Sequence, residues 1–287
     1  AALVSARHAD LARTIAEEAG KPLKQARAEA TRCVDTLTFA AVAARGLTGE
    51  MVPIASSASG AGKLAFTLRE PVGVVAAIAP FNFPLNLVAH KVAPAIAAGC
   101  PVVVKPSEDA PLSAHALLDI LHTAGLPEGA VSIVNGPGEI VGAALADHPD
   151  IAMISFTGSA DVGWELARRH PRIRVALELG NATPVIVTAD ADIDDAAARI
   201  AGSGFTHAGQ SCVSVQRVLV EASVHDRLRD ALVARFEQLV VGDPLDEATD
   251  VGPLITTAAR DRVGSWIREA EASGARVVTG GGVRDEL

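Results

Sequence analysis

The 287-residue sequence contains no tyrosine, two tryptophans and seven phenylalanines. Its three cysteines, Cys33, Cys100 and Cys212, are an odd and scattered set that fits free thiols in a reducing cytoplasm better than disulfides or a zinc site. Acidic residues outnumber basic ones, and the net charge of −9 leaves no basic face for nucleic acid. No apolar run approaches the roughly 20 residues of a membrane helix, and the N-terminus lacks a signal-peptide pattern. We therefore expect a cytoplasmic protein without nucleic-acid, membrane or metal partners.

Small and aliphatic residues dominate what remains, since 49% of the chain is hydrophobic. Between Val72 and Leu177, continuous apolar runs alternate with segments at helical spacing, which predicts a parallel sheet covered by helices on both faces. Ligands of such sheets bind at the carboxyl ends of the strands. A second α/β unit begins at Asn181 and includes an expected strand over Arg276 to Val278. The sequence therefore predicts an α/β fold whose second sheet is incomplete.

The segment Phe205 to Cys212 reads Phe-Thr-His-Ala-Gly-Gln-Ser-Cys and predicts a turn that ends in a thiol. We expect Cys212 to open the strand that continues through Val213 to Val220. Gly209 removes a side chain that would crowd the approach to the sulfur, and a cysteine thiolate needs such access to act as a nucleophile. The alternative is that Cys212 is one more small buried hydrophobe.

Four further motifs lie at ends of predicted strands. Glu178 follows the strand Ile173 to Leu177, and Asn82 lies in Pro80-Phe81-Asn82-Phe83-Pro84. The other two motifs are Lys105-Pro106-Ser107-Glu108 and Phe156-Thr157-Gly158-Ser159. With the cysteine motif they follow one another in the order and spacing of the aldehyde dehydrogenase superfamily, which the sequence resembles from end to end.

The resemblance implies a modified Rossmann cofactor domain at residues 1–52 and 72–180 and the first part of an α/β catalytic domain at residues 181–287. It implies that residues 53–71 form a hairpin that pairs with a neighbouring subunit in a homo-oligomer, a dimer or a tetramer. Family members usually extend beyond both ends of this sequence. We therefore expect the chain to be a fragment of a longer protein.

The resemblance also implies a nicotinamide dinucleotide as cofactor. The standard G-x-G-x-x-G fingerprint is absent, since Gly136 to Gly142 is one residue too long and can equally be a turn before a packing helix. The turn at Ser159 follows a strand and opens a helix, which suits a phosphate. Glu108 is expected at the adenosine ribose, where a carboxylate favours NAD over NADP. The residues expected at the cofactor are Ala79, Pro80, Phe81, Lys105, Ser107, Glu108, Gly138, Gly142, Phe156, Gly158, Ser159, Gly163, Glu178, Leu179 and Gly180.

For catalysis the resemblance implies four residues: Cys212 as nucleophile, Glu178 as general base for a water, Asn82 as an oxyanion donor, and Lys105. The implied reaction is oxidation of an aldehyde to a carboxylic acid through a thioester. Relatives that transfer the acyl group to coenzyme A often lack the glutamate, so hydrolysis is favoured. Acyl transfer to coenzyme A, and a truncated family member that only binds, remain the alternatives.

Some positions depart from the family pattern. Asn181 replaces the second glycine after Glu178, and Phe81 stands where tryptophan is common. Ser211 precedes the cysteine where some relatives that take phosphorylated or phosphonate aldehydes carry an arginine, which argues against a strongly anionic substrate. Arg45 and Arg217 leave that option open. The chain looks closest to lactaldehyde or phosphonoacetaldehyde dehydrogenases.

Overall fold

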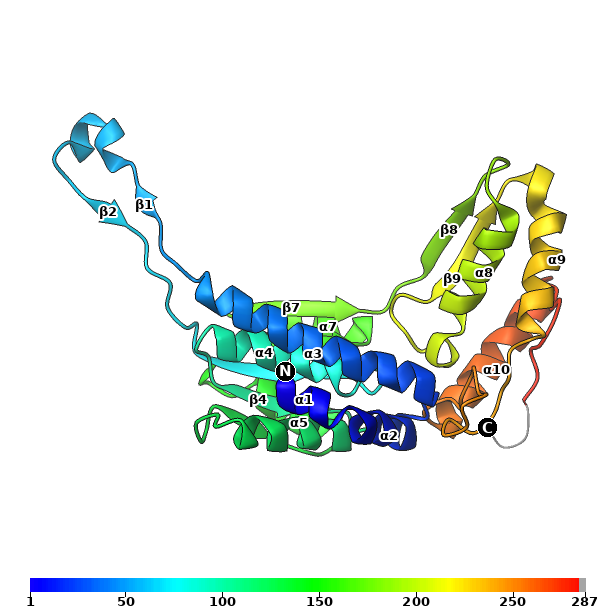
Figure 1. The fold of residues 1–287 in the computed structure, drawn as a ribbon. Helices are drawn as coiled ribbons and strands as arrows, with labels where there is room; N and C mark the ends of the chain where they lie inside the picture. Colours follow the sequence, from blue (N-terminus) through cyan, green and yellow to red (C-terminus); the bar gives the residue numbers. More distant parts are fainter. Residues whose placement is uncertain (284–287) are drawn as a thin grey trace.

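The computed structural model describes residues 1–283, and Figure 1 shows their fold. The chain begins with helices α1 (Ala2–Ala6), α2 (His8–Ala19) and α3 (Leu23–Arg45). The helical spacing of apolar residues over Leu3 to Ala19 predicts a single helix, but the structure interrupts it at Arg7, whose φ of −102° and ψ of 17° are not helical. Helix α2 ends at Gly20, whose φ of 66° is the left-handed conformation that glycine adopts readily.

A five-stranded parallel sheet follows, with the strand order β5-β4-β3-β6-β7. This sheet confirms the predicted α/β architecture. Because β3 pairs with β4 on one side and β6 on the other, the strand order reverses between β3 and β6. The carboxyl edge at such a reversal is where ligands of open α/β sheets bind. The elements are β3 (Val74–Ile78), α4 (Asn86–Ala97), β4 (Val102–Lys105), α5 (Leu112–Thr123), β5 (Val131–Ile133), α6 (Ala143–Ala146), β6 (Ile151–Gly158), α7 (Ala160–Arg169) and β7 (Arg174–Leu179).

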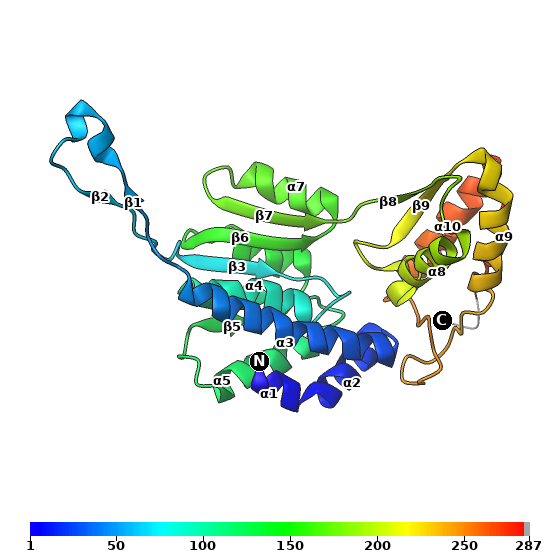
Figure 2. The same cartoon turned by 45° about the horizontal axis from the view of Figure 1, so that its top comes forward.

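Alternating side chains divide the core between the two faces of this sheet. On β3, Val75 and Ala77 pack with α4 and α5, whereas Ala76 packs with α6 and α7. On β7, Leu177 and Leu179 pack against the second of these cores. Figure 2 shows α7 beside β7, and α3 packed along α4. Since successive strand residues point to opposite faces, Glu178 lies on the α4 face of the sheet.

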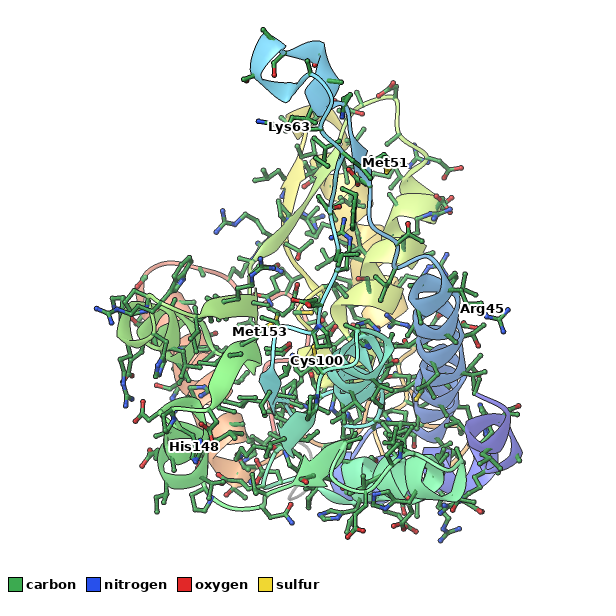
Figure 3. The ribbon with its side chains drawn as sticks, turned by 90° about the vertical axis from the view of Figure 1, so that its left-hand side faces the viewer. Arg45, Met51, Lys63, Cys100, His148 and Met153 are labelled. Atoms are coloured by element: carbon green, nitrogen blue, oxygen red, sulfur yellow. The ribbon has the colours of Figure 1, made fainter. Side chains whose placement is uncertain are left out.

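A two-stranded arm projects from the body between α3 and β3 (Figure 1). Its strands β1 (Met51–Val52) and β2 (Ala65–Phe66) pair antiparallel, and the turns η1 (Ile54–Ser56) and η2 (Ala58–Gly60) lie between them. The alternating pattern of Lys63 to Arg69 predicts a strand over all seven residues, whereas β2 is only two residues long. Leu64, at 74% exposure, points into solvent. Figure 3, seen from this side, places Met51 and Lys63 on the arm.

The second unit consists of a βαβ element followed by two helices. Its parallel strands β8 and β9 enclose a core with α8 and α9 that contains Val187, Ile193 and Leu228. Asp192 caps α8, since its carboxylate accepts from the amides of Asp194 and Asp195, both at 3.1 Å. The elements are β8 (Thr183–Val187), α8 (Ile193–Gly204), η4 (Thr206–Gly209), β9 (Val215–Val220), η5 (Ala222–Val224), α9 (His225–Phe236) and α10 (Thr257–Ala272).

Three expectations for individual elements are wrong. Cys212 lies in a turn rather than at the start of a strand, because β9 begins only at Val215. The sequence of Ile140 to Asp147 predicts one helix, whereas the structure has a π-helical turn, η3 (Gly138–Gly142), followed by the four-residue α6. Residues 276–278 form no strand and pair with no other segment of the described chain.

None of the helices within residues 1–283 combines the length and apolar composition that a membrane crossing requires.

Candidate functional site

A pocket of about 250 Å³ lies at the carboxyl ends of β3, β6 and β7, at the reversal of strand order. It is also lined by the turn that ends in Cys212, so four segments far apart in sequence meet there. The predicted site residues that line it are Pro80, Phe81, Asn82, Gly158, Ser159, Glu178, Leu179, Gly180 and Cys212.

The turn before Cys212 has an unusual backbone. His207, Ala208 and Gly209 have φ values of 50°, 55° and 78°, so two residues with side chains lie in the left-handed region beside the glycine. Such conformations cost free energy and persist where the surrounding structure holds them. The amide of His207 donates to Gln25 Oε1 at 2.8 Å, which ties the turn to α3.

The side chain of His207 is fully buried beside Phe81, with ring centroids 6.2 Å apart. Neither ring nitrogen has a hydrogen-bond partner among the described residues. Burial lowers the pKa of His207 to about 3, and the nearby Lys21 ammonium adds to the effect. The ring is therefore neutral at physiological pH, and a general-base role at this position is not supported by any contact.

Asn82 is held against the same turn. Its Nδ2 donates to the carbonyl of Gln210 at 2.8 Å, and its Oδ1 is buried without a partner among the described residues. Because an amide nitrogen carries two hydrogens, one donor of Asn82 remains for a ligand. Gln210 connects further: its Nε2 donates to the His207 carbonyl at 3.1 Å, and its Oε1 accepts from the amide of Ile255 at 3.0 Å.

The position where Asn181 replaces a glycine also contacts the cysteine. Asn181 Nδ2 donates to the backbone carbonyl of Cys212 at 2.5 Å. The Asn181 Oδ1 in turn accepts from the Thr183 hydroxyl. The substitution thus adds a side-chain contact that links the segment after Glu178 to the cysteine.

Beneath Glu178 lies a buried cation. Lys91, on α4 and 6% exposed, donates from Nζ to Thr157 Oγ1 at 2.7 Å and to Ser155 Oγ at 3.3 Å. Thr157 is the register partner of Glu178 across β6 and β7. Burial lowers the pKa of Lys91 to about 8, and the Glu178 carboxylate offsets part of that shift. The carboxylate is itself exposed to the pocket.

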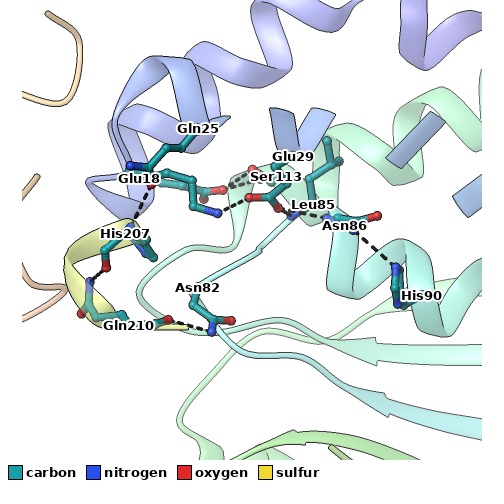
Figure 4. A network of polar contacts seen from close by, with 11 residues as sticks. Glu18, Gln25, Glu29, Asn82, Leu85, Asn86, His90, Ser113, His207 and Gln210 are labelled. Carbon is teal, nitrogen blue, oxygen red and sulfur yellow. Dashed lines mark hydrogen bonds and ion pairs between the residues drawn. The ribbon is translucent and has the colours of Figure 1, made fainter. Parts of the chain in front are cut away.

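A buried network fixes the chain between Asn82 and α4 (Figure 4). Glu29 Oε1 accepts from the amides of Leu85 and Asn86, both at 3.0 Å, at the N-terminus of α4. A carboxylate is favourable there because the free amides and the helix dipole are positive. Glu29 Oε2 pairs with the buried Lys21, whose Nζ lies 3.7 Å from the ring centroid of Phe83. The residue after Asn82 is therefore anchored by its ring.

Several predicted cofactor residues lie outside the pocket. Lys105, Ser107 and Glu108 lie at or after the carboxyl end of β4, and the Lys105 carbonyl accepts from the amide of Ala79 at 3.0 Å. Burial lowers the pKa of Lys105, and Glu108 counteracts part of this effect. No contact joins Lys105 to Cys212.

The remaining predicted glycines have different surroundings. Gly163 and Phe156 belong to the packing of α7 on the sheet: a Cβ on Gly163 would lie 2.5 Å from Leu179 Cδ2 and 3.3 Å from Phe156 Cε1. Gly138 and Gly142 lie in the π-helical turn after β5, where an added Cβ would meet nothing within 4 Å. Neither of these two therefore requires glycine for packing within the described chain.

The two arginines considered for an anionic substrate do not line the pocket. Arg45 ends α3 at the base of the arm, as Figure 3 shows. Arg217 is exposed on β9.

Sequence reasoning missed Lys91, Thr157, Gln210 and Gln216, of which all but Lys91 line the pocket. The signal for Lys91 was present, since it is the one lysine in a helix whose other polar residues are only Asn86 and His90. Its partners could not be read, because they depend on the register of β6.

Comparisons with known proteins bear on this site. A family model described as the aldehyde dehydrogenase family matches residues 1–287. The 3-sulfolactaldehyde dehydrogenase of Priestia aryabhattai is 43% identical over 280 residues, which are 97% of this chain and 58% of that protein. The lactaldehyde dehydrogenase of Methanococcus vannielii is 41% identical over 280 residues, 96% of this chain and 59% of that protein.

Among solved structures, the crystal structure of glyceraldehyde-3-phosphate dehydrogenase from Methanocaldococcus jannaschii complexed with NADP is similar, with a TM-score of 0.93 and 40% identity. The match covers 99% of this chain and 62% of that one. The chain thus spans about three fifths of the length of the relatives it matches. These matches confirm the predicted aldehyde-dehydrogenase-like fold. The chain belongs to the aldehyde dehydrogenase family.

Proposed function

We propose that the protein oxidises an aldehyde to a carboxylic acid with a nicotinamide cofactor, through a thioester on Cys212. One observation carries the proposal: Cys212, Glu178 and Asn82 come from distant segments and line the same pocket at the reversal of strand order. Membership of the aldehyde dehydrogenase family supports the reaction class. The relatives named above are dehydrogenases of small aldehydes, which supports a small aldehyde as substrate.

In the first step the Cys212 thiolate attacks the carbonyl carbon, and negative charge develops on the oxygen. The free donor of Asn82 and the backbone N–H of Cys212 stabilise that charge. A single donor of this kind contributes a factor of roughly 10² to 10³ in rate. Asn82 is suited to this role because its other donor and its neighbour Phe83 are already held in place.

The residues at the carboxyl end of β6 fit a dinucleotide. Ser159 precedes α7 in an extended conformation, and its side chain makes no capping hydrogen bond, so the first amides of α7 are available to a pyrophosphate. A nicotinamide held there would supply the hydride acceptor that oxidation of the adduct on Cys212 requires. We propose NAD rather than NADP, because Glu108 at the end of β4 would repel a 2′-phosphate. The similar Methanocaldococcus structure is a complex with NADP, so activity with NAD and with NADP should be measured side by side.

Glu178 then acts as general base for the water that hydrolyses the thioester. Its exposure to the pocket gives the water access. Lys91 is a positioning group in this proposal, because its hydrogen bonds go to Thr157 and Ser155 rather than to the pocket. The presence of Glu178 favours hydrolysis over transfer to coenzyme A.

We further propose that residues 1–52 and 72–180 act as the cofactor domain, residues 53–71 as the oligomerisation hairpin and residues 181–287 as part of the catalytic domain. The arm supports the hairpin assignment, since it projects from the body and exposes apolar side chains such as Leu64 and Leu68. A partner subunit would cover them, in a dimer or tetramer.

The test follows NADH formation by the purified protein with NAD and a panel of short aldehydes, without coenzyme A. Cys212→Ala is expected to abolish turnover. Glu178→Gln is expected to keep a first-turnover burst of one NADH per site and to lower the steady rate by a factor of roughly 10² to 10⁴. Cys100→Ala, which removes a buried thiol elsewhere, is the control. Full activity of Cys212→Ala would overturn the mechanism, and strict dependence on coenzyme A would favour acyl transfer.

A further inference from the structure

Cys212 is a central residue of a β-turn. The Ser211 carbonyl accepts from the Ser214 amide at 3.1 Å, which closes the turn around Cys212 and Val213. This bond fixes the peptide unit that joins Ser211 to Cys212. Because the C=O and N–H of a trans peptide point in opposite directions, it also fixes the direction of the Cys212 N–H, the proposed oxyanion donor. It does not fix the central peptide of the turn, which joins Cys212 to Val213.

The central peptide is held from outside the turn, by Asn181. Its carbonyl, that of Cys212, accepts from Asn181 Nδ2 at 2.5 Å and from no other residue of the described chain. Its N–H, that of Val213, has one acceptor among the described residues, Ser211 Oγ, at 3.5 Å. That distance is long for a hydrogen bond. Asn181 is therefore the main restraint on the central peptide.

The two peptide planes that meet at the Cα of Cys212 determine where its Cβ projects. The bond that closes the turn sets the first plane, and Asn181 sets the second. Cys212 and Glu178 line the same pocket, so the direction of the sulfur decides whether an aldehyde carbon there can meet it. A restraint on the central peptide thus acts on the nucleophile without contacting the substrate.

A second bond holds the Asn181 amide in the orientation that this restraint needs. A carbonyl oxygen accepts and cannot donate, so the amide atom that faces Cys212 is Nδ2. The Thr183 hydroxyl donates to Asn181 Oδ1 and supports this orientation from the other side. Asn181 lies between β7, which carries Glu178, and β8, which begins at Thr183. The two side chains therefore tie the connection between these strands to the cysteine turn.

We propose that Asn181 is a positioning residue for the reaction, and that with Thr183 it holds the peptide after Cys212 so that the nucleophile faces the pocket. The inference rests on the proposed function, since the position that matters is the one for attack on an aldehyde. The glycine that is usual at position 181 in the family could not supply this contact. The neighbouring Gly180 does not supply it by packing, because a Cβ there would meet nothing within 4 Å.

The kinetic test follows NADH formation from propanal and NAD by the purified protein. Asn181→Ala removes the donor and is expected to lower kcat by roughly fivefold to fiftyfold, with KM for propanal within about twofold of the parent value. Asn181→Gly should behave in the same way. A loss confined to kcat indicates a misplaced nucleophile, because the contacts to the bound substrate are unchanged. An unchanged kcat in Asn181→Ala, or a loss that appears in KM alone, would overturn the inference.

Asn181→Asp separates the donor from the shape of the side chain. The carboxylate has nearly the same size and can still accept from Thr183, but it has no hydrogen to give to the Cys212 carbonyl. Its kcat is expected to be as low as that of Asn181→Ala or lower. Parent activity in Asn181→Asp would show that the side chain acts by packing and would refute the donor role.

Thr183→Val tests the second bond of the pair. Valine keeps the branched shape of threonine and loses the hydroxyl, so kcat is expected to fall by roughly twofold to fivefold. The double variant should be no slower than Asn181→Ala alone, because both changes act through one contact. The matched control is Thr188→Val, just beyond the other end of β8, where the Thr188 hydroxyl donates to Asp190 Oδ1 at 2.6 Å. Losses that multiply in the double variant would contradict a shared contact.

A second measurement does not depend on turnover. The rate at which iodoacetamide alkylates Cys212 is read by peptide mass spectrometry, and the other two thiols, Cys33 and Cys100, are buried. Asn181→Ala is expected to react roughly threefold or more slowly, because the sulfur of a loosened turn spends part of its time facing away from the pocket. Thr188→Val should react at the parent rate.

The two measurements distinguish the failures. If the parent protein oxidises no aldehyde but Asn181→Ala slows alkylation, the proposed function fails while the positioning of Cys212 by Asn181 stands. If propanal is oxidised and Asn181→Ala matches the parent protein in both kcat and alkylation rate, the positioning role is wrong and the proposed function stands.

Discussion

At the scale of single residues, the charge state of the buried Lys91 beneath the site can be tested directly. Lys91 is held by two hydroxyls of β6, with the Glu178 carboxylate close enough to affect its charge. Its pKa of about 8 lies below the ordinary 10.5 because burial disfavours the ammonium. The folded state therefore loses this proton at lower pH than the unfolded state does.

This difference predicts a pH dependence of stability. Below about pH 8 Lys91 is protonated in both states, and its buried charge lowers the free energy of unfolding. Between about pH 8 and 10.5 the unfolded state binds more protons than the folded state. The free energy of unfolding therefore rises with pH in this range. The expected gain from Lys91 is about 2 kcal/mol between pH 7.5 and 9.5. Lys91→Met should lack this gain, which urea unfolding at a series of pH values would show.

Two controls apply to this prediction. The exposed Lys63→Met is expected to follow the parent protein across the pH range. Burial raises the pKa of Cys33 to about 12, so this thiol makes the free energy of unfolding fall with pH. Because Cys33 is present in both the parent protein and Lys91→Met, its contribution cancels in the comparison. Identical slopes for the parent protein and Lys91→Met would show that the lysine is not titrating as a buried group.

The candidate site was predicted from motifs in the order and spacing of a known family, not from any one motif alone. The structure brings Cys212, Glu178 and Asn82 to one pocket, and their catalytic roles stay a prediction. Lys91 could not be found this way, because its environment depends on which face of β6 carries Thr157. The left-handed His207 and Ala208 were also not predictable, since alanine rarely adopts a positive φ and histidine does so in only a small minority of cases.

At the scale of elements, the packing of α7 on the sheet places the loop beside Glu178. Gly163 is buried, and a Cβ there would lie 2.5 Å from Leu179 Cδ2. Leu179 lines the pocket, so a push on its side chain would be directed at the site. Gly163 therefore allows the close approach of helix and strand. The sequence analysis had instead expected this glycine at the cofactor.

The predicted consequence concerns Gly163→Ala compared with Gly202→Ala. Both glycines lie in helices, and alanine in an open helical position stabilises by up to about 1 kcal/mol. Gly202 has nothing within 4 Å, so its variant should show that gain. Gly163→Ala should be less stable than Gly202→Ala by about 1–3 kcal/mol because of overpacking. Thermal unfolding measures both, and equal gains would mean that Leu179 moves aside at no cost.

Most elements of the first sheet were predictable, because buried parallel strands are continuous apolar runs bounded by turns. The π-helical turn at Gly138–Gly142 was not, since no residue type in it specifies the i→i+5 hydrogen bonds of a π-turn. The expected strand over 276–278 failed for a different reason. A strand needs a partner, and the apolar pattern of Val277 and Val278 cannot show whether one is available.

At the scale of the whole molecule, the segment 244–255 joins the second unit to the corner between α2 and α3. The amide of Leu23 donates to the Pro244 carbonyl at 2.8 Å, and Gln25 Nε2 donates to the Asp250 carbonyl at 2.9 Å. The same Gln25 accepts from the amide of His207 in the cysteine turn. The position of Cys212 thus depends on contacts made far from it in sequence.

Gly252 is the point of closest approach in this junction. A Cβ there would lie 2.1 Å from the Gly20 carbonyl oxygen, a backbone atom that cannot rotate away. Gly252→Ala must therefore displace segment 244–255 from α2. Because this segment also bonds Gln210 through the Ile255 amide, the displacement should loosen the cysteine turn. We expect a loss of about 1–3 kcal/mol in the free energy of unfolding and faster hydrogen exchange at the amides of Leu23 and Ile255.

The control is Gly46→Ala after α3, where the nearest atom to a new Cβ is a carbonyl oxygen at 3.5 Å, an ordinary contact. Its exchange rates at Leu23 and Ile255 should match those of the parent protein. Cys212 alkylation gives the functional readout: if the junction holds the turn, the iodoacetamide rate changes in Gly252→Ala and not in Gly46→Ala. A loss of stability in Gly252→Ala with unchanged exchange at Ile255 and unchanged alkylation would mean that Asn82, Asn181 and Gln25 hold the turn without segment 244–255.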